Sequence, residues 1–191
     1  IQNPISQIIG NNLLVENDFI NHFLSILSSV PNIKMEIIDF MGNIGINSGI
    51  SYTNNNFTEK LKSITDGDGN GNKKVYILIG IGYIYDKVLD EGVNHLFSIF
   101  NHLDDYPNSY FVFADNYSSY KRIMKEEWYS KSVNKSGIWI GKGIDSQKAM
   151  EISNLATSDV NEDFQGLSYV INNEKYQVMK CIGTIERSDT Y

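Results

Sequence analysis

Apolar residues along this chain follow two periods, which alternate from one segment to the next. Short, nearly continuous apolar runs predict strands at 4–9, 34–40, 75–81, 109–114 and 137–140. The segments between them place apolar residues three or four positions apart and predict helices at 17–30, 57–64, 86–105, 116–129 and 145–155. Strands that alternate with helices indicate an α/β fold with a mainly parallel sheet.

The apolar run at 75–81, VYILIGI, predicts the position of one strand within that sheet. It is continuous rather than alternating, as in strands that are covered on both faces, so we expect it in the middle of the sheet. Residues 166–171 and 176–181 flank four polar residues and predict a C-terminal antiparallel hairpin. Residues 41–56 are rich in Gly, Asn and Ser and predict a loop. No repeat or linker divides the chain, so we expect a single domain over 1–191.

The first predicted helix has its large apolar residues on one stripe, which predicts a buried face. The stripe consists of Phe19, Phe23, Ile26, Leu27 and Val30. Asn17 is the expected N-cap and Pro31 the expected stop.

Composition narrows the classes of protein to consider. The net charge of −7 argues against a nucleic-acid binder, which usually has a basic face. The single cysteine, Cys181, excludes an internal disulfide. Apolar runs are too short to span a membrane. The chain has neither a starting methionine nor a signal peptide, so we expect it to be a fragment of a longer protein.

Residues 8–30 have the layout of a phosphate-binding loop, in which a strand leads through glycine to a helix. The motif G-x-x-x-x-G-K-[ST] begins at Gly10 and continues through Asn11, Asn12, Leu13 and Leu14. Its last three positions hold Val15, Glu16 and Asn17 instead of glycine, lysine and a hydroxyl residue. Glu16 would repel a phosphate. The sequence thus indicates either a nucleotide loop that has lost its phosphate contacts or an ordinary turn.

A second catalytic position is also vacant. Nucleotide-hydrolysing folds of this layout place acids at the end of a central strand, where they hold Mg²⁺ and activate water. Here the strand at 75–81 ends with Gly80 and Ile81, and no acid follows until Asp86. We therefore expect no catalytic residue in this domain.

Other motifs are incomplete. Asp66, Asp68 and Asn70 match the first half of a calcium loop, but the ninth and twelfth positions are Lys74 and Ile77, which favours a solvated turn. The three histidines have no zinc-binding spacing, so we expect no metal site.

Four residues at helical spacing within 116–129 have two interpretations. Tyr117, Tyr120, Met124 and Trp128 could form a partner-binding face or belong to the core.

Taken in order, these segments resemble the FtsK/SpoIIIE-type RecA-like motor domain. They are the loop at 10–17, KMEIIDF at 34–40, VYILIG at 75–80, YFVFADN at 110–116, SGIWIGKGIDSQKAM at 136–150, FQGLSYV at 164–170 and YQVMKCI at 176–182. The ordered set extends over nearly the whole chain. The IIDFMG segment and the missing catalytic residues narrow the resemblance to the last, degenerate motor-like domain of the EssC/EccC membrane ATPases of type VII secretion.

The resemblance implies a RecA-like, P-loop NTPase-like fold and assigns roles to positions. Gly10 matches the first loop glycine, Glu16 and Asn17 replace the lysine and the hydroxyl residue, and Gly80 and Ile81 replace the metal-side and water-side acids. This domain is then expected to be silent and to need no cofactor, whereas ATP and Mg²⁺ act in other domains of the parent ATPase.

The resemblance also implies partners and a location. C-terminal domains of that family help to recognise secreted helical substrates and to regulate the active motor. The expected partners are therefore secreted substrates, other motor domains and, in a full-length hexamer, further copies, but no nucleic acid. The expected location is the cytoplasmic part of a bacterial membrane protein. Two alternatives stay open: a nucleotide-binding ATPase with atypical residues such as Lys142, and a stand-alone interaction module.

Overall fold

The structure is a computed structural model that describes residues 5–11, 13–31, 33–42, 51–53, 57–68, 70–87, 90–133, 135–160 and 167–180. Within these residues eight strands form one sheet, in the order β3-β2-β4-β5-β1-β6-β7-β8. They are β1 (Ile5–Gly10), β2 (Lys34–Asp39), β3 (Ser51–Thr53), β4 (Lys74–Ile79), β5 (Ser109–Asn116), β6 (Gly137–Ile140), β7 (Leu167–Asn172) and β8 (Lys175–Lys180). Strands β1 to β6 pair in parallel, whereas β7 pairs antiparallel with both β6 and β8. The predicted mainly parallel α/β sheet with a C-terminal hairpin is confirmed.

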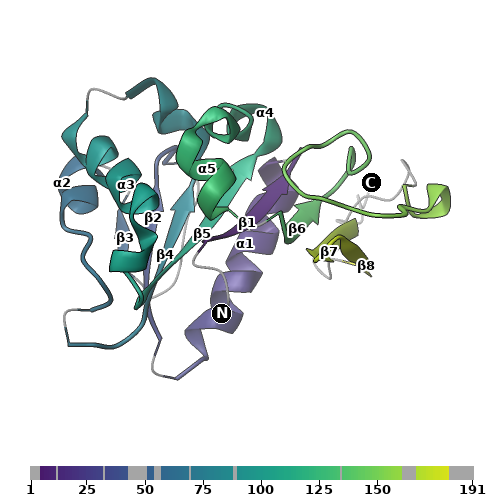
Figure 1. The fold of residues 1–191 in the computed structure, drawn as a ribbon. Helices are drawn as coiled ribbons and strands as arrows, with labels where there is room; N and C mark the ends of the chain where they lie inside the picture. The colour runs from purple at the N-terminus through teal and green to yellow at the C-terminus, as the bar shows by residue number, and fades with distance from the viewer. Residues whose placement is uncertain are drawn as a thin grey trace, which may run out of the picture.

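Helices cover the sheet unequally on its two faces. The described α-helices are α1 (Leu13–Ser28), α2 (Phe57–Lys62), α3 (Glu91–Asn101), α4 (Tyr117–Tyr120) and α5 (Glu127–Ser132). Short 3₁₀ helices are η1 (Ile81–Lys87), η2 (Leu103–Asp105), η3 (Ile123–Lys125) and η4 (Thr157–Asp159). Helices α2 to α5 pack on one face, and α1 lies on the other (Figure 1).

Strand β4 confirms the prediction of a central strand. It pairs in parallel with β2 on one side and β5 on the other, and all but its first residue are buried. Tyr76 and Leu78 belong to the cluster under α2 to α5, whereas Ile77 and Ile79 belong to the cluster under α1. Burial on both faces is the reason why its sequence is continuously apolar.

The predicted helices at 17–30 and 86–105 have different bounds in the structure. The first begins at Leu13, so Asn17 lies inside α1 and its prediction as N-cap was wrong. The helix predicted at 86–105 divides into α3 and η2, and α3 starts at Glu91 because Asp90 accepts hydrogen bonds from the N–H groups of Gly92 and Val93 at 2.9 and 3.1 Å.

The helix predicted at 116–129 is broken into α4, η3 and α5, and residues 145–155 contain no α-helix. Just before the latter segment, Gly143 has a φ of +83° and is followed by a turn, from which the chain continues in irregular conformation. Sequence analysis also missed the short strand β3 within the predicted loop 41–56.

The buried face of α1 differs from the predicted stripe. Ile20 and Leu24 are buried against the sheet, with Phe23 and Leu27 beside them. Ile26 and Val30 are 53% and 38% exposed, so their predicted burial was wrong. The apolar surface of α1 is therefore wider than the part that the described sheet covers.

A buried glutamine joins β1 to the α4–α5 side of the sheet. The Gln7 amide nitrogen donates hydrogen bonds to the carbonyl oxygens of Ala149 at 3.0 Å and Ser136 at 3.3 Å. Its oxygen accepts from the hydroxyl groups of Tyr120 at 2.9 Å and Tyr129 at 3.2 Å. Burial raises the pKa of Tyr129 to about 12 and also raises that of Tyr120 well above its usual value, so both hydroxyl groups stay protonated donors.

Candidate functional site

The carboxyl ends of the parallel strands form the edge where an α/β sheet usually binds ligands. Strand β1 ends at Gly10 beside Asn116 of β5 and Ile140 of β6. Because β5 separates β1 from β4, the two sequence-predicted nucleotide positions lie on non-adjacent strands of this edge.

The connection between β1 and α1 is two residues long, which is too short for a phosphate loop. In the motif aligned on Gly10, positions 13–17 belong to the loop, but in the structure they are already helical. The side chain of Asn11 donates a hydrogen bond to the carbonyl oxygen of Lys142 at 2.9 Å. It also lies so close to Gly143 that a Cβ there would be 2.7 Å from the Asn11 amide nitrogen. Asn12 lies outside the described residues.

The second predicted position, at the end of β4, is filled by close packing. Gly80 has a φ of +74°, and a Cβ there would come within 2.5 Å of the Met41 side chain. A Cβ at Gly82 would lie 2.4 Å from the carbonyl oxygen of Ser119. Ile81, between these glycines, is fully buried. Residues 80–82 therefore supply no carboxylate of their own, and Gly80 and Gly82 have no space for a larger side chain.

Sequence analysis missed a buried carboxylate at this edge, that of Asp115 at the end of β5. Its oxygens accept hydrogen bonds from the Gly82 N–H and the Ser119 hydroxyl, both at 2.6 Å. Burial raises the pKa of the Asp115 carboxyl to about 6, and these hydrogen bonds limit the rise. An acid that directly follows the buried run FVFA was the signal in the sequence.

Asp39 at the end of β2 has a similar structural role. It is buried, and one of its oxygens accepts hydrogen bonds from the N–H groups of Met41 at 2.9 Å and Gly42 at 3.0 Å. Asp39 and Asp115 thus hold the turns that follow their strands. Their role here is structural, because each carboxylate already accepts hydrogen bonds from nearby residues.

The raised pKa of Asp115 predicts a dependence of stability on pH. The folded chain binds this proton more tightly than the unfolded chain, so the free energy of unfolding should fall as pH rises from about 4 to 6 and level off above. The full effect is about 3 kcal/mol. Asp115→Asn should remove this component, because its oxygen can accept from Gly82 while its NH₂ group donates to the Ser119 hydroxyl.

Urea unfolding of both proteins between pH 4 and 7 measures the effect as the difference between their curves. The difference is needed because other carboxyl groups act in the opposite direction. The pKa values of Asp90 and Glu127 are lowered in the folded chain, so these two groups make the chain less stable as the pH falls. Parallel curves for the two proteins would contradict the role of Asp115.

The aspartates of the half-matched calcium loop are occupied by protein donors. Asp66 accepts from the backbone N–H and side-chain amide of Asn108 at 2.7 and 2.8 Å. Asp68 forms an ion pair with Lys34 at 2.7 Å and accepts from Asn70 and Asn72, which lowers its pKa. Among the described residues, no group of three or more His, Cys, Asp or Glu side chains is placed to hold a metal ion.

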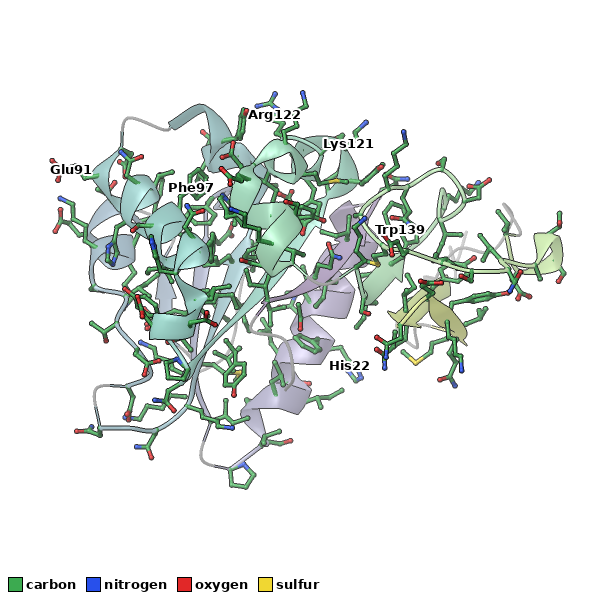
Figure 2. All side chains as sticks on the ribbon, in the orientation of Figure 1. His22, Glu91, Phe97, Lys121, Arg122 and Trp139 are labelled. Carbon is green, nitrogen blue, oxygen red and sulfur yellow. The ribbon has the colours of Figure 1, made fainter. Side chains whose placement is uncertain are left out.

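Of the two interpretations of Tyr117, Tyr120, Met124 and Trp128, the structure favours the core over a partner-binding face. Tyr120 and Trp128 are fully buried, because the breaks between α4, η3 and α5 turn both rings toward the sheet. Tyr117 packs edge-on against Trp139, labelled in Figure 2, and accepts a hydrogen bond from the Lys148 N–H at 2.8 Å. Met124 is half-buried against the same core. These four residues do not form a common exposed surface.

An uncovered groove lies instead on the α1 face, toward the amino ends of β1, β5 and β6. Its volume is about 430 Å³. Phe23 and Leu27 of α1, Tyr110 of β5, Ile138 of β6 and Val170 of β7 line it. None of its lining side chains is charged, so the groove fits an apolar ligand surface.

Comparison with known proteins relates this fold to one group of solved structures. No protein-family model and no curated protein sequence matches the chain. It is similar to the cytoplasmic domain of the Thermomonospora curvata type VII secretion ATPase EccC, with 11% identity and a TM-score of 0.63 over 95% of this chain and 24% of that chain.

Two further structures have the same fold. EccC ATPases 2 and 3 of Thermomonospora curvata, in complex with a signal sequence peptide, align with a TM-score of 0.61 and 10% identity over 95% of this chain and 37% of that one. The cytoplasmic domain of EssC aligns with a TM-score of 0.55 and 12% identity over 95% of this chain and 40% of that one. The chain therefore spans less than half the length of each structure. These structural similarities confirm the predicted resemblance to EccC and EssC at the level of the fold.

Proposed function

We propose that this chain is a non-catalytic, ATPase-like module of a type VII protein secretion motor, where it recognises secreted substrates or regulates active motor domains. Its place would be the cytoplasmic part of a membrane-anchored protein. None of the described helices is long and apolar enough to cross a membrane, so the anchor in this proposal belongs to another part of the parent.

One observation carries the proposal, namely the two-residue connection between β1 and α1. Phosphate-binding loops surround the β-phosphate with successive backbone N–H groups before the helix begins. Here the helix starts at Leu13, and the Asn11 side chain is bonded to the Lys142 carbonyl. The fold is retained while the cradle for phosphate is shortened, which supports a scaffold that acts by binding proteins.

We expect the isolated chain to bind Mg²⁺–ATP more weakly than about 1 mM and to release no phosphate, because it lacks the lysine and N–H cradle. Isothermal titration with a phosphate-release assay measures both quantities. Glu16→Lys combined with Asn17→Thr is the matched variant. It restores two motif side chains but leaves α1 beginning at Leu13, so it should not restore binding. Micromolar binding with turnover by the unmodified chain would contradict the proposal.

A nucleotide-sensing role is the second candidate, and the position of Lys142 favours it. The Lys142 backbone accepts the hydrogen bond from Asn11, and its side chain is exposed beside the β1–α1 connection. If titration detects binding, Lys142→Ala should abolish it. Binding that survives this substitution would exclude Lys142 as the cation.

The apolar groove beside α1 is the proposed surface for substrate recognition. One of the structures with this fold, EccC ATPases 2 and 3, is a complex with a signal sequence peptide. A helical export signal would place an apolar face on Phe23, Leu27 and Val170, since amphipathic helices bind to uncharged grooves.

Leu27→Lys should therefore weaken capture of a secreted helical substrate at least tenfold, because it places an ammonium group in an uncharged groove. Asn21→Lys is the matched control, since Asn21 is exposed on the same helix and does not line the groove. Figure 2 labels its neighbour His22 on the outer side of α1. Fluorescence anisotropy with labelled signal peptide measures both affinities. Equal losses in the two variants would exclude the groove.

A further inference from the structure

A second pocket lies within the irregular segment between β6 and β7. Its volume is about 410 Å³. Aliphatic side chains of Ile152, Leu155 and Val160 form walls, and Asp145, Gln147 and Thr157 supply polar atoms. Residues 145–155 of this segment were predicted as a helix, but they contain no α-helix, and the pocket lies among irregular residues between Ile144 and Val160.

Only some of these polar atoms can bind a ligand. The Gln147 side chain is occupied, since it accepts from the Met150 N–H at 2.8 Å and donates to the Met150 carbonyl at 2.9 Å. In the part of the chain that the structure describes, the exposed side chains of Asp145 and Thr157 form no hydrogen bond or ion pair. The pocket thus offers a carboxylate and a hydroxyl oxygen, both of which accept hydrogen bonds.

The only charge in the lining of this pocket is negative. Asp145 is the only charged residue in its lining. Burial raises the pKa of the neighbouring Tyr169, and Asp159, Tyr176 and Asp145 raise it further. Lys142 and Lys148 lie near Asp145 in sequence, but within the described residues neither forms an ion pair with it. A cation is therefore the ligand that this pocket favours.

We propose that this pocket binds an arginine side chain presented by a protein partner. The aliphatic walls would pack against the three methylene groups, and Asp145 and Thr157 would accept from the guanidinium N–H groups. Arginine fits better than lysine because its planar, weakly hydrated group has several donors in fixed directions. This inference uses no part of the proposed secretion role and stands or fails separately.

The test is a titration of the ¹⁵N-labelled chain with N-acetyl-arginine amide, followed by NMR chemical shifts. We expect saturable shifts in residues 144–160 at millimolar concentration. N-acetyl-citrulline amide, which is neutral and nearly the same shape, should bind at least tenfold more weakly, and N-acetyl-lysine amide at least threefold more weakly. The arginine shifts should weaken as salt is raised.

Asp145→Asn should reduce the arginine affinity at least fivefold, and Thr157→Val should reduce it about twofold. Glu151→Gln is the matched control, because Glu151 is an exposed acid of the same segment that pairs with Lys135 and does not line the pocket. Unchanged shifts elsewhere show that each variant is folded. Equal binding of citrulline or lysine, equal binding by Asp145→Asn, or no saturable shift would overturn the proposal.

Discussion

Trp128→Ala is expected to lower the free energy of unfolding by about 3–5 kcal/mol, because it removes a large, fully buried side chain from a close-packed core. The indole ring contacts Phe100 and Phe113, with ring centroids 4.6 and 6.0 Å apart, and Phe97 at 5.6 Å. For a chain of this size the loss corresponds to a fall in Tm of about 10–15 °C. Urea unfolding followed by circular dichroism measures it.

Trp128→Phe is the matched control. The indole N–H of Trp128 is buried and has no hydrogen-bond partner among the described residues, so a phenyl ring loses no polar contact. We expect a cost of about 1–2 kcal/mol from the smaller volume alone. A Trp128→Ala protein as stable as the unmodified chain would show that this residue lies on the surface, as the partner-binding hypothesis required.

Gln7→Leu is expected to cost about 3–5 kcal/mol, although the new side chain has nearly the same volume. Two tyrosine hydroxyl groups and two backbone carbonyl oxygens then lose their partner inside the core. Each buried polar group left without a hydrogen bond costs about 1–3 kcal/mol. The measurement is the change of the urea midpoint at constant slope.

A double-mutant cycle identifies the cause. When Tyr120→Phe is added to Gln7→Leu, one unsatisfied hydroxyl disappears, so the combined loss should be smaller than the sum of the single losses by about 1 kcal/mol or more. Additive losses would mean that packing, rather than the polar cluster, determines the cost. Ser118→Ala at an exposed position of α4 serves as a control and should show no coupling.

Most of the sheet could be predicted from the sequence because its central strands, such as β4 and β5, are buried on both faces. A strand that is buried on both faces has a continuous apolar sequence, which is easy to recognise. The predicted bounds of β6 match the observed ones, and those of β4 differ by one residue at its start and two at its end. The hairpin was predicted as well, with a connection of four residues. In the structure the connection contains only Asn173 and Glu174, whose positive φ angles of 48° and 64° suit a two-residue hairpin turn.

Helices were predicted less well, because spacing alone does not show which neighbour a side chain contacts. The stripe on α1 mixed residues under the sheet with Ile26, which is exposed. The aromatic residues of 116–129 have helical spacing, but they reach the core through three short helices rather than one.

The candidate site could be predicted only in part. The replacement of motif residues at Glu16, Gly80 and Ile81 is visible in the sequence. The short β1–α1 connection and the hydrogen bonds of Asp115 are not, because they depend on contacts between residues far apart in the chain. Neither pocket has a sequence pattern of its own, since each is lined by residues from irregular or separate segments.

The position of β1 between β5 and β6 also affects how the chain folds during synthesis. Ile5 pairs with Phe111, and Ile8 pairs with Ile138, so β1 is synthesised well before the two strands that complete it. At usual rates of translation, roughly 5–20 s pass before β5 follows β1. Throughout that time the backbone N–H and C=O groups at the edges of β1 are open to other chains. Nascent protein should therefore depend on chaperones, and refolding of the full chain should be slow for its size.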